Sequence, residues 1–134
     1  MIDFSQCMVV VVEDDPLNAS LVQKMLKMIG VENVIVCRSG VETRQAVVNV
    51  TDVDLVLLDI QMPEEDGFDI LNSLRLLPSM DNTRVVAITA NVMPSHVEQA
   101  RAAGFDGFLG KPFKFDQFRS QVTRILEGQQ VWEP

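Results

Sequence analysis

Five short apolar runs, each rich in branched residues, alternate with longer stretches whose apolar residues have helical spacing. The runs cover residues 8–12, 34–37, 53–58, 85–89 and the weaker 107–109. This texture is typical of parallel strands that are buried on both faces. Strands that alternate with helices need crossover connections, so the chain is predicted to fold as an α/β domain with helices on both faces of a parallel sheet.

Boundary residues support the helices between these strands. Asp15 before Pro16 is typical of a helix start, and Gly30, Gly104 and Gly128 are expected to end helices. Ser39 with Glu42 three residues later has the spacing of a capping box. Helical spacing places three apolar sets on single helix faces: Leu17, Leu21, Met25 and Met28; Ile70, Leu71, Leu74 and Leu77; and Phe118, Val122 and Ile125.

Composition limits the function. The chain has 134 residues, of which 47% are hydrophobic and 22% charged, which suits one folded domain. A formal charge of -8 disfavours binding to nucleic acid or to an anionic membrane, and favours a cation or a basic partner. Without a signal peptide or a long apolar run, the protein is expected to be soluble and cytoplasmic.

Two cysteines and a short tail complete the organisation. Cys7 and Cys37 are expected to be free thiols, because parallel neighbouring strands would hold them roughly 10 Å or more apart. We assign residues 1–128 to the domain and residues 129–134 to a C-terminal tail. Its lone Trp132 is either a docking residue or the start of a linker.

Polar residues gather where the predicted strands end. Glu13, Asp14 and Asp15 follow the first strand, Asp59 ends the third, Thr89 ends the fourth and Lys111 follows the fifth. Ligands of such sheets bind at the carboxyl ends of the strands, so these groups should meet at one edge. Taken singly, each has an ordinary interpretation as a helix cap, a solvated acid or a surface lysine.

Together, these residue types indicate phosphoryl transfer. Crowded carboxylates repel unless a cation neutralises them, and hard oxygen ligands suit Mg²⁺. Lys111 and Thr89 could bind the oxygens of an incoming phosphoryl group, and Asp59 could accept that group as an aspartyl phosphate.

Four segments carry a family resemblance. The segments VVVVEDDPLN, VDLVLLDIQMPEEDGFDIL, VVAITAN and AAGFDGFLGKPF resemble the response-regulator receiver domain of bacterial two-component signalling, in order and spacing. The resemblance implies a flavodoxin-like, doubly wound (βα)5 fold with a five-stranded parallel sheet of order 2-1-3-4-5. It also implies a cis peptide bond between Lys111 and Pro112.

The resemblance assigns the acceptor and the metal ligands. Asp59 would accept a phosphoryl group from a phosphohistidine on a sensor histidine kinase or a histidine phosphotransfer protein. Asp14 and Asp59 would bind Mg²⁺, with Mn²⁺ as an alternative. Glu13 would reach the metal mainly through water, and Gln61 would contribute its backbone carbonyl. Asp15 is interpreted as a helix cap.

The resemblance also assigns a switch. Lys111 would pair with the phosphoryl group, Thr89 would bond to it, and Phe108 would turn inward in response. The surface formed by the fourth helix, fifth strand and fifth helix would then change, and a second copy or an effector would bind there. Gln61 and Asn91 occupy positions that tune the lifetime of the aspartyl phosphate.

Two other functions share parts of this pattern. A dehalogenase-type phosphatase also uses an aspartyl phosphate, but it wants an acid two residues after the nucleophile, where this chain has Gln61. A degenerate receiver would lack an acid, the acceptor or the lysine. We therefore expect a phosphoacceptor rather than an enzyme, either standing alone or cut from a longer kinase or regulator. The single His96 is expected at the surface rather than in a phosphohistidine carrier.

Overall fold

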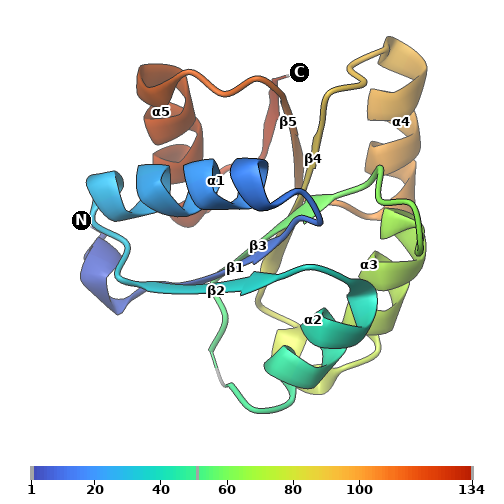
Figure 1. Cartoon of the computed structure of the whole chain (residues 1–134), viewed down its shortest axis with the longest axis horizontal. Coiled ribbons are helices and arrows are strands. Elements are labelled where there is room, and N and C mark those ends of the chain that lie inside the picture. The colour runs from blue at the N-terminus through green and yellow to red at the C-terminus, as the bar shows by residue number, and fades with distance from the viewer. Residues whose placement is uncertain (1, 51, 134) are drawn as a thin grey trace.

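A parallel sheet of order β2-β1-β3-β4-β5-β6 lies at the centre of the computed structural model, which describes residues 2–50 and 52–133. Helices cover both faces of the sheet (Figure 1). The strands are β1 (Met8–Val12), β2 (Asn33–Cys37), β3 (Leu55–Asp59), β4 (Arg84–Thr89), β5 (Gly107–Gly110) and β6 (Val131–Glu133). The helices are α1 (Pro16–Ile29), α2 (Gly40–Val47), α3 (Gly67–Arg75), α4 (Pro94–Ala103) and α5 (Phe115–Leu126), with 3-10 turns at Phe4–Gln6 and Pro78–Met80.

The predicted architecture is confirmed, with one addition. The five expected strands have the expected order, and the third begins at Leu55 rather than at residue 53. The sheet also has a sixth strand, because Val131–Glu133 pairs in parallel with β5. The tail is therefore part of the sheet, at least as far as Glu133.

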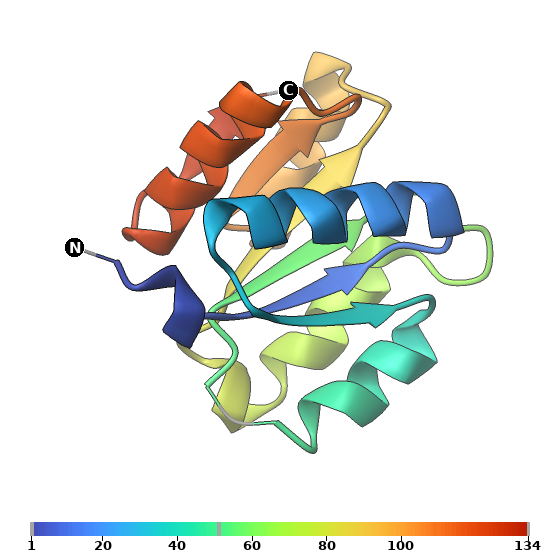
Figure 2. The same cartoon turned by 60° about the vertical axis from the view of Figure 1, so that its left-hand side comes forward.

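Alternation along the strands divides the core into two layers. Odd-numbered valines of β1 and their neighbours in β3 and β4 pack with α1 and α5, while the even-numbered ones pack with α2, α3 and α4. Figure 2 shows α1 and α5 on one side of the sheet and α2 and α3 on the other. Because Val9, Val10, Val11 and Val12 are all fully buried, the run of four valines is an inner strand covered on both faces.

Helix ends follow the predicted capping residues. The Asp15 carboxylate accepts from Leu17 N at 2.9 Å, and Gly30 takes the left-handed conformation that ends α1. The Ser39 hydroxyl accepts from Glu42 N at 3.1 Å. The Glu42 carboxylate accepts from Arg38 N at 3.3 Å, one residue before the expected partner.

One helix face was predicted wrongly. Leu17, Leu21 and Met28 are 82%, 45% and 68% exposed, so only Met25 of that set is buried. The core face of α1 carries Ala19, Val22, Met25 and Leu26 instead. Apolar residues occupy two overlapping stripes of α1 that share Met25, and helical spacing alone cannot choose between them.

The two thiols agree with expectation. Cys7 and Cys37 are both free and buried. β1 and β2 are parallel neighbours, and Cys37 lies opposite Val12, at the other end of β1 from Cys7. Within the described residues, every helix is too short or too polar to span a bilayer.

Candidate functional site

Three strand ends bring the predicted site together. Asp59 is the last residue of β3, Glu13 follows β1 directly, and Lys111 follows β5. β1 and β5 lie on either side of the β3–β4 pair, so the three side chains converge at the carboxyl edge of the sheet. Glu13 is 1% exposed and Asp59 is 5% exposed, so both carboxylates lie largely out of water.

Lys111 joins the two carboxylates. Its ammonium donates to Glu13 Oε1 and, at 3.1 Å, to Asp59 Oδ2. Its backbone N–H donates to the carbonyl of Thr89 at 2.8 Å, which ties the loop after β5 to the end of β4. The Lys111–Pro112 peptide bond is cis, as predicted.

Burial and mutual repulsion set the charge of this cluster. Burial raises the pKa of Glu13 to about 7, and the neighbouring Asp59 adds to that rise, while Lys111 opposes it. Burial alone would lower the pKa of Lys111, but the Glu13 and Asp59 carboxylates raise it above its ordinary value. The ammonium is therefore held charged between the two acids.

The acids fit a hard cation. Glu13, Asp14 and Asp59 each offer a carboxylate oxygen, and these oxygens lie within 4.8 Å of one another. Asp14 lines a surface pocket of about 450 Å³, so the cluster is open to solvent on that side. Oxygen ligands with room for water match the preferences of Mg²⁺, and Mn²⁺ accepts the same donors.

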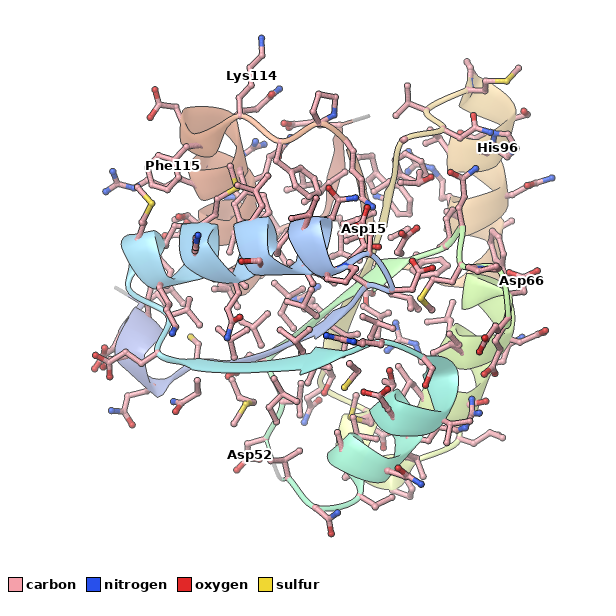
Figure 3. The ribbon with its side chains drawn as sticks, viewed as in Figure 1. Asp15, Asp52, Asp66, His96, Lys114 and Phe115 are labelled. Carbon is pink, nitrogen blue, oxygen red and sulfur yellow. The ribbon has the colours of Figure 1, made fainter. Side chains whose placement is uncertain are left out.

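Asp15 is a helix cap, as predicted. It begins α1, where its carboxylate accepts from Leu17 N and from Asn18 Nδ2. Figure 3 shows Asp15 at the first turn of α1. Its oxygens are therefore committed to the helix, which leaves Glu13 and Asp14 as the acids of the first loop that belong to the cluster.

Neighbouring polar groups hold the acceptor and the threonine. Gln61 N donates to Asp59 Oδ1 at 2.9 Å, so the turn after β3 fixes the orientation of that carboxylate. Thr89 is fully buried, and its hydroxyl accepts from Asn91 N at 3.1 Å. Because Asp59 pairs with Ile88, Thr89 lies one residue past the acceptor on the adjacent strand.

The predicted switch needs a Phe108 ring that is exposed before phosphorylation, and the structure does not have one. The ring of Phe108 is already fully buried, so it has no exposed position from which to turn inward. Its partner in the sheet is Trp132 of β6, which packs against the same apolar cluster. The tail was predicted to lie outside the sheet, so the pairing of Trp132 with Phe108 was not expected.

His96 lies on α4 (Figure 3) and is half-buried rather than fully at the surface. Its Nδ1 is buried, and no hydrogen-bond partner for it occurs among the described residues. With Gln61 and Asn91 it lines a surface pocket of about 420 Å³. The sequence around the start of α4 did not predict that His96 is half-buried.

Comparison with known proteins adds a family. The sequence model of one protein family, the response regulator receiver domain, matches residues 9–123. The signal transduction histidine-protein kinase BarA of Escherichia coli K12 is 34% identical over 122 residues, which is 90% of this chain but only 13% of that kinase. The polar-differentiation response regulator DivK of Brucella ovis is 31% identical over 88% of this chain and 94% of its own length.

A solved structure agrees. The receiver domain of the sensor histidine kinase PA1611 from Pseudomonas aeruginosa PAO1 superposes with a TM-score of 0.76 at 27% identity, covering 90% of this chain and 94% of that one. That structure has a magnesium ion coordinated in its active-site cleft.

Proposed function

The chain belongs to the response regulator receiver domain family, and on that premise we propose that it is a phosphorylation-controlled switch or a phosphorelay intermediate. One observation carries the proposal: a single ammonium, that of Lys111, binds both the buried Asp59 and the buried Glu13 at the carboxyl edge of the sheet. This arrangement supplies an acceptor, a cation for the phosphoryl oxygens and acids for a metal in one place.

Asp59 is the proposed nucleophile. One of its carboxylate oxygens attacks the phosphorus of a phosphohistidine on a sensor kinase or phosphotransfer protein. An oxygen–phosphorus bond forms, the nitrogen–phosphorus bond breaks, and its electron pair stays on the imidazole nitrogen. Gln61 N–H holds the other side of the carboxylate, which limits rotation of the nucleophile.

Lys111 and Thr89 stabilise the transferred group. The Lys111 ammonium lies on Asp59 before transfer, so it is already positioned to bind an oxygen of the incoming phosphoryl group. The Thr89 hydroxyl can donate one hydrogen bond, and Thr89 lies one residue past the register partner of the acceptor on the adjacent strand β4. Lys111 acts through its charge and position and Thr89 through a positioned hydrogen bond, and positioning and charge neutralisation are what phosphoryl transfer mainly requires.

Glu13, Asp14 and Asp59 would hold a divalent cation, with the backbone carbonyl of Gln61 as a further ligand. Mg²⁺, when bound, neutralises negative charge on the carboxylates and on the phosphoryl oxygens. The donor set fits this role because its oxygens already converge. The receiver domain of PA1611, which binds magnesium in its cleft, supports the same assignment.

The chain is proposed to act as an acceptor, not as a catalyst for other molecules. It would assist its own phosphorylation and dephosphorylation, and it would work in the cytoplasm, where kinase domains supply the phosphoryl group. The histidine kinases among its relatives support a kinase partner, although this chain spans only a small part of their length.

Intact-mass spectrometry after incubation with acetyl phosphate and Mg²⁺ tests the proposal. Wild type should gain one phosphoryl group, and Asp59→Asn should gain none. Asp69→Asn is the matched control, since Asp69 is an exposed aspartate in the first turn of α3. Equal labelling of Asp59→Asn and wild type would contradict the assignment.

A further inference from the structure

The C-terminal strand occupies the edge of β5. Val131, Trp132 and Glu133 pair in parallel with Gly107, Phe108 and Leu109. β6 is the last strand of the sheet and lies on the side of β5 away from β4. In Figure 1 the red strand β6 lies beside β5, between α4 and α5. This is the surface at which a phosphorylation response was expected.

The side chains of β6 contact both flanking helices, α4 and α5. Val131 is 1% exposed and packs in the layer formed with α5. Glu133 accepts from Arg124 of α5 through both oxygens, at 2.6 and 2.9 Å, and from Gln121 Nε2 at 3.3 Å. Alternation places Trp132 on the opposite face, where Arg101 of α4 lies 4.3 Å from its ring centroid.

β5 is shaped for this close approach. A Cβ atom on Gly107 would lie 2.6 Å from the carbonyl oxygen of Val131, which real Cβ atoms do not tolerate against backbone. The edge of β5 therefore admits the tail only because residue 107 has no side chain.

The same strand connects the tail to the site. Phe108 pairs with Trp132 on one side and with Ala87 of β4 on the other. Thr89 is two residues after Ala87, so its side chain lies on the same face of the sheet as Phe108. A shift of the Phe108 ring toward Thr89 would withdraw apolar support from beneath Trp132.

We propose that residues 131–133 are a resident cover of the β5 edge, and that phosphorylation of Asp59 loosens it. The proposal rests on the proposed function for its trigger. A three-residue strand makes few backbone hydrogen bonds, so it can dissociate without unfolding the domain. Its release leaves the edge of β5 unpaired and frees the guanidinium groups of Arg101 and Arg124 from Trp132 and Glu133. An effector would then bind there by adding an extended segment with an alternating apolar, aromatic and acidic pattern.

Tryptophan fluorescence tests the cover directly. Trp132 is the only tryptophan and the chain has no tyrosine, so the emission reports the tail alone. Adding beryllofluoride with Mg²⁺ should shift the emission to longer wavelength and increase quenching by acrylamide. Gly107→Ala should give the released spectrum without the phosphoryl mimic. In wild type with beryllofluoride, hydrogen exchange should become faster across β5 and β6, while the amides of β1 and β3 stay protected.

Two readouts separate this inference from the proposed function. Fluorine NMR shows whether beryllofluoride binds, and Asp59→Asn should abolish both that signal and the Trp132 response. If beryllofluoride binds wild type while emission, quenching and exchange at β6 stay unchanged, the cover is not coupled to the site and the inference is overturned, although the proposed function stands. If beryllofluoride does not bind and Asp59 is not labelled by acetyl phosphate, both fail.

Discussion

Lys111 Nζ lies 3.1 Å from Asp59 Oδ2, and this contact joins the loop after β5 to the end of β3 across the intervening β4. The same ammonium binds Glu13 after β1. Three segments far apart in the sequence are thus joined by one ammonium group, and all three side chains have little exposure to water. Within the described residues, no other lysine or arginine pairs with either carboxylate.

Replacing Lys111 should slow phosphorylation. In Lys111→Met the incoming phosphoryl group loses its positive partner, so labelling of Asp59 by acetyl phosphate should fall by about a hundredfold, as when one preorganised donor is removed. The measurement is the rate of mass gain at fixed acetyl phosphate and Mg²⁺. Lys114→Met is the matched control, because Lys114 is exposed and points away from the site (Figure 3). Similar loss of rate in both variants would mean that Lys111 has no special role.

Asp14 should control the response to magnesium. Asp14→Asn removes one of three converging carboxylates, so Mg²⁺ should raise the Tm of wild type but raise that of the variant much less. Without metal, the variant should be more stable than wild type by about 1 kcal/mol or less, since one repulsive charge is gone. Differential scanning calorimetry with and without Mg²⁺ measures both effects.

Asp15→Asn is the control for this series. Asparagine caps helices about as well as aspartate, so α1 should stay intact. In wild type the Asp15 carboxylate oxygens already accept from Leu17 N and Asn18 Nδ2. The shift in Tm of Asp15→Asn with Mg²⁺ should therefore match that of wild type. A response to Mg²⁺ lost in Asp15→Asn and kept in Asp14→Asn would reverse the assignment.

The strands and the site follow from local sequence because their causes are local. Runs such as Val9–Val12 are apolar and β-branched on every residue, as a strand covered on both faces requires. Parallel strands end at the same edge, so Glu13, Asp59 and Lys111 could be placed together without knowing the packing.

Features that depend on contacts between distant elements were missed. α1 has apolar residues around much of its circumference, and its packing against the sheet and α5, rather than helical spacing, decides that Val22 and Leu26 are buried and Leu17 is exposed. β6 has three residues in the structure, too few for a strand pattern. Its pairing depends on Arg101, Arg124 and Gly107, which lie elsewhere in the sequence.

Docking of β6 should weaken at low pH. The Arg124 guanidinium beside Glu133 holds the pKa of that carboxyl below its ordinary value of 4.5, and Gln121 acts in the same direction. A pKa that is lower in the docked than in the free state means that the stabilisation is complete above pH 4.5 and is lost as the pH falls through the docked value.

The emission of Trp132 measures this titration. Its maximum should move to longer wavelength as the pH drops below 4.5, with far-UV circular dichroism reporting whether the rest of the domain stays folded. Glu133→Gln keeps the shape but removes the charge, so it should be more released at neutral pH and lose this titration. An unchanged titration in Glu133→Gln would show that another group is responsible.

Thr89 should connect phosphorylation to the tail without being needed for phosphorylation itself. Thr89→Ala keeps Asp59 and Lys111 in place, so acetyl phosphate should still label the chain. The hydroxyl that would move toward the phosphoryl group is gone, so the space beside the Phe108 ring no longer depends on whether Asp59 is modified. The Trp132 emission should therefore change much less on adding beryllofluoride than in wild type. Thr89→Ser retains the hydroxyl and should restore the response, since serine supplies the same donor. Matched responses of Trp132 in wild type and Thr89→Ala, with Asp59 fully modified in both, would show that the signal reaches β6 by a route other than Thr89 and Phe108.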